Sequence, residues 1–548
     1  MKTKNNILIN GGRIVLLALG VLSWNCSDDV LNNEPLDRIS EGTFWSSEAE
    51  AQMALAGVYS HTSTGNERDF LSYIATFFEK SDNVFTLAGE IRESFIDGKN
   101  TAINGIIEQM WASCYTRIAK ANYFIENIDK VNMDEAERNE MKAEARFIRS
   151  VYYFYLTTHW GDAPLVTKML KLSEANSISR TPKAKIAEFA ISELTEAAAH
   201  LPATRPGAEF GRVVKAAALA FKGRFQMAKE DWAGAAATYK SIIDLGVHAI
   251  DPQYEELFLE VGERSSEIIF SIQYIPAVGG KYSSQVPYRW APYTAGGVSQ
   301  IGFLNDLVES YECIDGLPID ESPMYDPQNP YEANGVRYRD PRLYYTVLLP
   351  NYSTFKGKKY VSHPDSTSSP DRMPQYSLTG YGVLKFVDEN YSGDFRTYGG
   401  DTPIIRYAEV LLSYLESMLE SGQPITQQLL DETINLVRGR AAVNMPPVTE
   451  TDPASLRPIL RNERRVELVL EGVRLWDLLR WNVAHINLDR RVYGAKVCPD
   501  PSDCGYQVDE EGYFFLYERN FREAVDYHWP IPQRELDINK SLTQNPGY

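Results

Sequence analysis

Histidine, cysteine and recognised catalytic motifs are scarce in this chain of 548 residues, which has seven His and five Cys. None of them forms an HExxH or CxxC pair, so the sequence offers no familiar set of zinc ligands. The glycine-rich phosphate-binding motifs and the GxSxG nucleophile elbow are missing as well. These absences argue against zinc hydrolases, nucleotide-binding enzymes and serine hydrolases with that elbow. They predict a protein with neither a cofactor nor a metal centre.

Positive charge is also in the minority. The chain has 55 Lys and Arg against 74 Asp and Glu, a net charge of −19. Binding to nucleic acid depends on clustered basic residues that release counterions, so this composition argues against a nucleic-acid partner. The hydrophobic content of 44% is enough for a large core. Tyrosine is the most frequent aromatic, with 33 residues, and its flat face and polar edge suit surface recognition.

The N-terminus has the pattern of an export signal. Residues 1–25 begin with basic residues and contain the apolar run Ile14–Leu22, which is far shorter than the roughly 20 residues of a membrane-spanning helix. Cys26 follows, and the acidic stretch 27–29 comes next. This arrangement resembles the lipobox of bacterial lipoproteins, whose thiol is diacylated, and the surface-export signal of Bacteroidota lipoproteins. The alternative is a secreted protein with an incidental cysteine.

Other cysteines and acidic loops leave two questions open. Cys498 and Cys504 flank a short polar loop that a disulfide would close, but the spacing alone does not decide whether they are bridged. The acidic loops 315–320 and 509–512 could hold a calcium ion. Neither has the alternating ligands of an EF-hand, so solvated turns are the preferred interpretation.

The first half of the chain has helical periodicity. Alanines alternate with bulky residues such as Trp232 and Tyr239, a pattern that lets paired helices approach closely, as in tetratricopeptide-type arrays. Asp231 is placed to cap the helix that contains them. We therefore predict that residues 26–250 form an N-terminal helical region of such pairs. Apolar residues at spacings of three and four predict helices over 102–131, 137–159, 183–201, 212–229 and 231–245.

Residues 251–548 are predicted to form a C-terminal region of a different character. Proline accumulates and helical periodicity fades between 251 and 400, which predicts a loop-rich insert with a short strand over 267–274. Long loops in compact proteins are usually functional or disordered, and the many aromatics favour function. Closing helices are predicted over 404–420, 425–441 and 456–481.

The last predicted helix carries three glutamates on one face. Paired carboxylates are what a glycosidase uses, but arginines lie close along the same segment, so an ion-pair network that joins helices is the preferred interpretation. The glutamates concerned are Glu463, Glu467 and Glu471.

Several segments resemble one family, the SusD/RagB nutrient-binding outer-membrane lipoproteins of the Bacteroidota. They are residues 142–149 leading into 160–164, residues 401–409, residues 463–478, and the ending 530–532 with 544–548. The resemblance implies a mostly α-helical SusD-like fold, with tetratricopeptide-like helix pairs as scaffold and loop-rich ligand-binding insertions. It also implies a lipid-anchored, surface-exposed outer-membrane protein without catalytic activity. Such a protein caps a SusC-like TonB-dependent transporter and hands it an oligosaccharide.

Alternatives to glycan binding stay open at this point. A surface glycoside hydrolase that uses carboxylates in the insert is one, and a peptide-binding member of the same family is another. The family motifs look structural, so they do not identify ligand contacts.

A candidate ligand site is instead predicted from the aromatic residues of the insert. Sugar rings present apolar C–H faces and a rim of hydroxyls, so a binder needs flat aromatics and short polar side chains. Trp290 is expected to be the central anchor, in an exposed turn between two prolines. The alternative is that the aromatics pack the loop onto the core. The predicted ligand-binding residues are Tyr282, Tyr288, Trp290 and Tyr293 from the insert, with Tyr73, Asp82 and Asn83 from an N-terminal segment.

Overall fold

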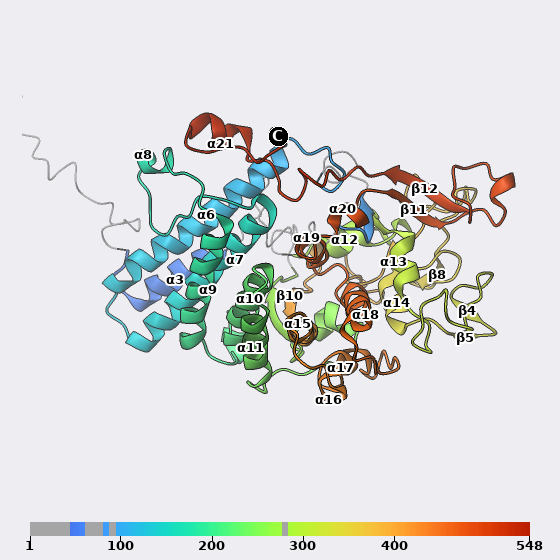
Figure 1. Cartoon of the computed structure of the whole chain (residues 1–548), viewed down its shortest axis with the longest axis horizontal. Helices are drawn as coiled ribbons and strands as arrows, with labels where there is room; N and C mark the ends of the chain where they lie inside the picture. The colour runs from blue at the N-terminus through green and yellow to red at the C-terminus, as the bar shows by residue number, and fades with distance from the viewer. Residues whose placement is uncertain (1–43, 61–79, 87–94, 277–282) are drawn as a thin grey trace, which may run out of the picture.

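Long helices pack side by side on one flank of the molecule, and loops with short strands occupy the other flank (Figure 1). This arrangement is that of a computed structural model, which describes residues 44–60, 80–86, 95–276 and 283–548. The protein is mostly helical, as predicted.

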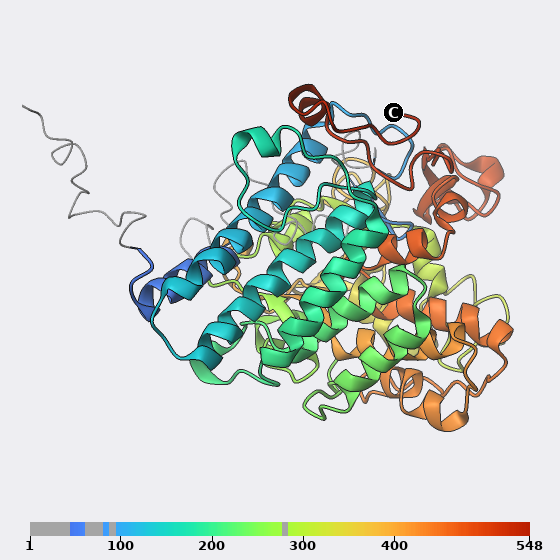
Figure 2. The same ribbon diagram turned by 60° about the vertical axis from the view of Figure 1, so that its left-hand side comes forward.

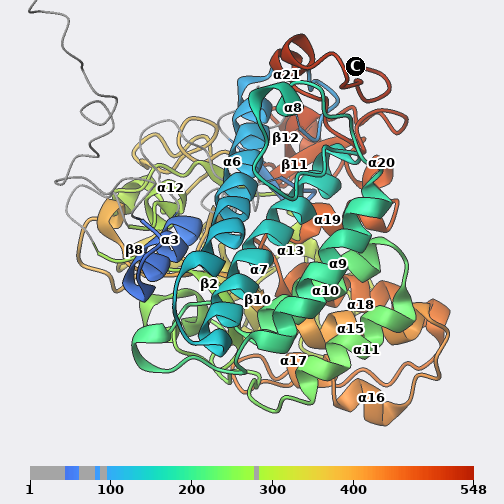
Figure 3. The same ribbon diagram turned by 90° about the vertical axis from the view of Figure 1, so that its left-hand side faces the viewer.

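The helical flank is a succession of antiparallel neighbours (Figure 3). All five helices predicted between residues 102 and 245 are confirmed, with ends that differ by a few residues. Asp231 caps the last of them by accepting a hydrogen bond from the Gly234 amide. Gly223 of α10 allows the close contact that was predicted, because a Cβ there would lie 2.5 Å from the ring of Tyr239 in α11. The helices are α3 (Glu48–Tyr59), α6 (Gly105–Asn127), α7 (Glu135–Trp160), α9 (Lys183–His200), α10 (Lys215–Ala228) and α11 (Trp232–Ile243).

The helical succession continues into the C-terminal half. α11 packs on α15 (Tyr407–Glu420), and α15 packs on α18 (Pro453–Glu467). Apolar residues from both halves belong to one hydrophobic core. The C-terminal segment then folds back over the start of α6 (Figure 2), where the Gln533 amide donates to the Ala102 carbonyl at 2.9 Å.

The strands are short, and every sheet among the described residues consists of two antiparallel strands. The predicted strand is confirmed as β2 (Ile268–Ile272), and it pairs with β10 (Thr402–Arg406). The other pairs are β1 (Val84–Thr86) with β3 (Ile301–Phe303), β11 (Arg491–Lys496) with β12 (Tyr513–Glu518), β4 (Glu332–Ala333) with β5 (Val336–Arg337), β6 (Val347–Leu348) with β9 (Gly382–Val383), and β7 (Thr354–Phe355) with β8 (Lys358–Lys359).

Shorter helices lie between the long helices and the strands and near the C-terminus. They are α8 (Leu172–Ala175), α12 (Val286–Trp290), α13 (Asn305–Ser310), α14 (Pro341–Thr346), α16 (Gln427–Asp431), α17 (Ile434–Arg438), α19 (Arg474–Arg480), α20 (Ala484–Asn487) and α21 (Gln533–Ile538).

The three closing helices were predicted too long. The first begins only at Tyr407, because the β-branched residues before it pair with β2. The second is divided into α16 and α17, and the break falls at Thr433, which has a non-helical backbone. The third is divided into α18 and α19, because Leu470 and Gly472 take left-handed φ values of 63° and 78° that end the helix.

Glu467 on α18 lies at the centre of a buried ion-pair network. Its carboxylate contacts Arg342 of α14 at 3.0 Å, Arg406 of β10 at 3.0 Å and Arg440 at 2.7 Å. None of these four side chains is exposed to solvent. Glu471 adds a second contact to Arg406 at 2.7 Å. Elements far apart in the sequence are therefore held by the same buried charges.

Two more carboxylates extend this network. Glu463, one helical turn earlier on α18, contacts Arg438 at 2.6 Å. Glu267, which immediately precedes β2, contacts Arg440 at 3.0 Å. The prediction that the glutamates of this segment join structural elements is confirmed for all three, Glu463, Glu467 and Glu471.

Glu467→Gln is expected to lower the free energy of unfolding by about 3–5 kcal/mol, because it leaves buried arginines without a charge partner. Burial by itself would raise the pKa of Glu467, but Arg440 and Arg406 lower it to about 2. A lowered pKa stabilises the fold above the ordinary glutamate value of 4.5, and this stabilisation is lost as the pH falls from there toward 2. Urea denaturation followed by circular dichroism at pH 7 and at pH 3 measures both effects.

The difference between wild type and Glu467→Gln should be large at pH 7 and smaller at pH 3. Glu432→Gln is the matched control, because Glu432 is exposed at the end of α16 and should change little. Equal midpoints for wild type and Glu467→Gln at pH 7 would contradict a stabilising role for the network.

Candidate functional site

The segment after β2 carries a short helix, α12, and a 3-10 turn, each with one half-buried tyrosine. Pro287 stands in the first turn of α12, where its missing N–H costs nothing. A 3-10 turn, η5 (Tyr293–Ala295), follows Pro292 and ends at Gly296. The φ of Gly296 is 84°, a left-handed conformation that favours glycine. The buried residues of α12 are Val286, Pro287 and Trp290, whereas Tyr288 and, in η5, Tyr293 are half-buried.

Tyr288 is paired with an exposed arginine from another loop. Arg396 donates a hydrogen bond from Nη2 to the Tyr288 hydroxyl at 3.1 Å, and its guanidinium carbon lies 4.3 Å from the ring centroid. Arg396 belongs to the 3-10 turn η6 (Phe395–Thr397), which Asp394 caps. This pair presents a cation beside an aromatic ring at the surface.

Tyr293 is paired with a second tyrosine from a third loop. Its ring centroid lies 4.9 Å from that of Tyr376, with the ring planes tilted by 59°. Asp371 is 1% exposed and accepts a hydrogen bond from the Thr294 hydroxyl at 2.7 Å, which holds η5 in place. We refer to the residues Tyr288, Tyr293, Thr294, Tyr376 and Arg396 as the α12 surface.

The prediction of an exposed Trp290 is wrong. The side chain is 1% exposed, and its ring meets that of Phe386 edge to face at 5.8 Å. The segment is helical instead of being an open turn, so Trp290 shares the inner face with Val286 four residues earlier. Trp290 is therefore a core residue beneath the α12 surface.

Asp82 and Asn83 are also buried, so the prediction that they form the polar rim of the site is wrong. Arg474 of α19 donates to both Asp82 oxygens, at 2.8 and 2.6 Å. Arg465 of α18 donates to the Asn83 side-chain oxygen at 2.7 Å. Burial would raise the pKa of Asp82, but Arg474 and Arg465 hold it well below its usual range. These side chains tie the segment before β1 to the closing helices.

Three predicted residues lie outside the described part of the chain: Tyr73, Tyr282 and Cys26. Their roles stay predictions.

Sequence reasoning missed three of the five residues of the α12 surface and the buried Asp371 beneath it. Thr294, Tyr376 and Arg396, like Asp371, are single polar or aromatic residues in loops and short 3-10 turns, where no periodicity marks them. Only the richness of the insert in aromatics indicated Tyr376. The pairing of these residues with α12 depends on contacts across about 80 to 110 positions of the chain and has no local signal.

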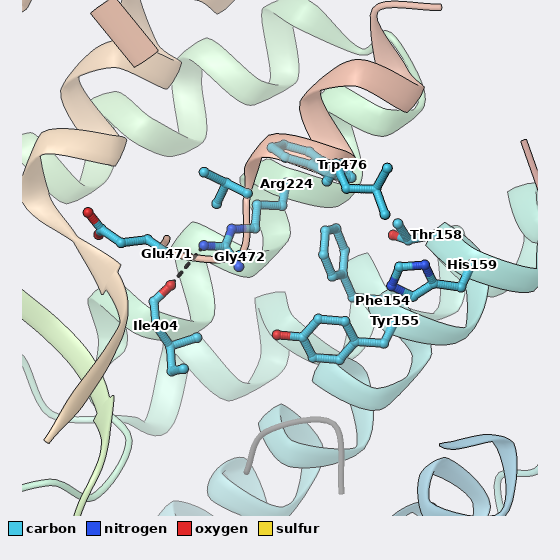
Figure 4. A pocket seen from close by; sticks show the side chains of 11 residues that line it. Phe154, Tyr155, Thr158, His159, Arg224, Ile404, Glu471, Gly472 and Trp476 are labelled. Carbon is cyan, nitrogen blue, oxygen red and sulfur yellow. Dashed lines mark hydrogen bonds between the residues drawn. The ribbon is translucent and has the colours of Figure 1, made fainter. Parts of the chain in front are cut away.

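A small pocket lies elsewhere, between α7, α10, β10 and the turn before α19 (Figure 4). Arg224 donates from Nη2 to the Ile404 carbonyl at 2.9 Å along one wall. The free volume is about 30 Å³, which accommodates one or two water molecules but no sugar ring. Its lining includes Phe154, Tyr155, His159, Glu471 and Trp476.

Two carboxyl groups near β2 and β10 have raised pKa values. Burial and the neighbouring Asp401 raise the pKa of Glu263 to about 7, and burial raises that of Asp401 to about 6. Asp401 accepts a hydrogen bond from the Tyr274 amide at 2.8 Å, and its own amide donates to Glu263 at 3.1 Å. Raised carboxyl pKa values are typical of catalytic acids but also of buried structural groups.

The structure decides one of the open questions on cysteine. Cys498 and Cys504 are joined in a disulfide, and Cys114 and Cys313 are buried. Over the described ranges, no cluster of three or more His, Cys, Asp or Glu side chains is arranged to hold a metal ion. Within the same ranges, no helix is both long and apolar enough to cross a bilayer.

A scaffold of paired helices that carries a loop-rich half defines the class of SusD-like proteins. The chain belongs to the SusD family: the model of that family matches residues 266–548. A second family model, described as "Starch-binding associating with outer membrane", matches residues 36–227.

Similarity to individual SusD-like proteins supports this assignment. SusD-like protein P25 of Formosa agariphila is 24% identical over 98% of this chain and 99% of its own length. Starch-binding protein SusD of Bacteroides thetaiotaomicron is 24% identical over 79% of this chain and 76% of its own. A solved SusD-like carbohydrate binding protein from Bacteroides fragilis has 39% identity and a TM-score of 0.86, covering 91% of this chain and all of that one. A laminarin binding SusD-like protein shares the fold, with 21% identity and a TM-score of 0.68 over 92% of this chain and all of that one.

Trp290→Ala is expected to lower the free energy of unfolding by about 3–5 kcal/mol, because it removes a fully packed indole from the core. Tyr293→Ala removes a half-buried ring at the surface and should cost much less. Thermal and urea denaturation of the two variants side by side measures the difference. A Trp290→Ala protein as stable as wild type would contradict the buried position of this residue.

Proposed function

We propose that the protein is a non-catalytic surface lipoprotein that binds oligosaccharides or polysaccharide fragments and delivers them to a SusC-like TonB-dependent transporter. The observation that carries glycan binding is the α12 surface, where partly exposed tyrosines from separate loops are paired with each other and with Arg396. The similarity to the solved carbohydrate binding protein from B. fragilis supports the same conclusion.

The chemistry of the α12 surface suits a sugar. A pyranose ring presents C–H groups that pack on aromatic faces, and the tyrosine rings at positions 288, 293 and 376 offer such faces. Hydroxyl groups around the ring need donors and acceptors, which Arg396 and the tyrosine hydroxyls supply. Binding of this kind requires no proton transfer.

Tyr288→Ala and Tyr293→Ala are each expected to weaken glycan binding by about tenfold or more, because truncation of an aromatic anchor typically costs about 2 kcal/mol. Their melting temperatures should stay near that of wild type. Affinity electrophoresis and calorimetry with starch, laminarin and a wider panel of soluble polysaccharides measure binding, and a peptide panel tests the other ligand class.

Tyr414→Ala is the control, since Tyr414 is a half-buried tyrosine on α15 in the helical scaffold. It should bind like wild type. Wild-type affinity in both α12-surface variants, with folding intact, would place the glycan site elsewhere. Binding of peptides without any binding of glycans would replace the proposed ligand class.

A glycoside hydrolase is the second candidate, and the raised pKa values of Glu263 and Asp401 are the observation that favours it. Against it, Asp401 is 6% exposed and accepts hydrogen bonds from the Ser271 hydroxyl of β2 and from the Tyr274 amide. Incubation of the purified protein with the polysaccharides that it binds, followed by measurement of reducing ends, distinguishes the two functions. Turnover that disappears in Glu263→Gln would establish the hydrolase and end the non-catalytic proposal.

The membrane attachment rests on the N-terminal sequence. Cys26 follows an apolar export segment and precedes an acidic stretch, which supports acylation of its thiol and display at the surface of the outer membrane. Metabolic labelling with a fatty acid should mark the wild type but not Cys26→Ala. Equal labelling of both proteins would exclude Cys26 as the acylated residue.

A stable complex with a TonB-dependent barrel is expected, because a binding protein needs a channel for its ligand and the helical flank offers an extended docking surface. Purification of tagged protein from detergent-solubilised outer membranes should bring down such a barrel in near-equal amount. Repeated isolation of the protein alone, under conditions that preserve other outer-membrane complexes, would contradict delivery to a transporter.

A further inference from the structure

The β11–β12 hairpin ends in a loop of residues 497–512, and the Cys498–Cys504 disulfide closes the first part of this loop. The loop is anchored where it leaves the strands, because the Val497 amide donates to the Gly512 carbonyl at 2.9 Å. Gly512 has a φ of 90°, and a Cβ there would collide with the Cys498 carbonyl. The hairpin tip is therefore closely packed around its bridge.

This tip packs on the segment 362–377 of the insert. Met373, Val497 and Cys498 form a small apolar cluster that is separate from the main core. A hydrogen bond of 2.9 Å joins Nε2 of His363 to the Val497 carbonyl. The Tyr506 hydroxyl donates to Asp365, which adds a contact beside the bridge. The segment 362–377 is thus in contact with the disulfide-closed tip through apolar packing and hydrogen bonds.

The same segment supplies one support of the α12 surface and one of its members. Asp371 accepts the hydrogen bond from Thr294, and Tyr376 packs against Tyr293. Met373 lies between these two residues in the sequence, and its amide donates to the Ser362 carbonyl at 2.9 Å, which closes the segment on itself. Contacts therefore run without interruption from the bridge to the tyrosine pair.

We propose that the disulfide-closed tip of the β11–β12 hairpin positions Asp371 and Tyr376, and through them Tyr293, for glycan binding. Cys498, Cys504 and Asp371 are positioning residues in this arrangement, since none of them needs to touch the ligand. The proposal rests on the proposed function of the α12 surface.

The physical reason is the small size of the apolar cluster that joins the segment to the hairpin tip. An irregular loop gains order only if its contacts outweigh the conformational entropy of its residues. The cluster around Met373 is small, so a tip without its bridge has more conformations to lose when it packs there. Loosening of the tip should then spread to Asp371 and Tyr376, although the distant helical scaffold keeps its structure.

Cys498→Ser/Cys504→Ser removes the bridge without changing the α12 surface. Hydrogen exchange of the purified protein should become faster in segments 362–377 and 293–297 and stay unchanged in α7. Affinity for the polysaccharide that the wild type binds best should fall by about 2- to 30-fold, the range expected when coupling acts through intermediate residues. Asp371→Asn should weaken binding in the same direction, whereas Asp320→Asn in an exposed loop is the matched control.

A triple variant tests whether the bridge and Asp371 act through one route. If they do, Asp371→Asn added to the double serine variant should weaken binding by less than the product of the separate effects. Unchanged exchange in 293–297 together with unchanged affinity in the double variant would overturn the proposal. If the wild type binds no polysaccharide, the proposed function fails, and the exchange measurement alone still decides whether the tip positions Tyr293.

Discussion

The buried cluster of arginines and glutamates around Glu467 is the constraint on which the C-terminal half depends. Removal of each charge from water costs several kcal/mol, and only complete pairing within the cluster offsets that cost. The elements α14, β10 and α18 and the residue just before β2 must therefore come together in the folded protein, because each contributes a member. This explains how a half with short strands and long loops keeps a defined geometry.

Residues of the family-like motifs also join segments that are far apart in the sequence. Asn545, near the C-terminus, donates to the carbonyls of Trp160 and Trp529, and Trp160 donates to the Pro530 carbonyl. The two ends of the motif set are thus joined at the end of α7. Arg474 performs a comparable task for the segment before β1 by binding Asp82. These residues hold parts of the scaffold together, which agrees with the expectation that the family motifs are structural.

The sequence predicted the parts of the fold that have a local cause. Helices between 102 and 245 follow from apolar periodicity, and the cap at Asp231 follows from a side chain beside its own helix. The spacing of Glu463, Glu467 and Glu471 predicts the network, but the arginines next to them in the sequence are not their partners. Arginines from other segments bind these glutamates, and Arg464 binds Asp477 instead. Such long-range choices have no local signal.

The candidate site was predicted less well for a related reason. Aromatic content located the α12 segment, but which side of a short helix faces the core depends on tertiary packing, and so Trp290 was assigned to the wrong side. The α12 surface is assembled from three loops that meet only in the folded protein. Loops vary more than the scaffold that holds them. Relatives with about 24% identity can therefore share the helices and the interactions that join them, while their loops present different surfaces. Membership of the family thus indicates the scaffold, whereas the choice of ligand depends on the loop residues.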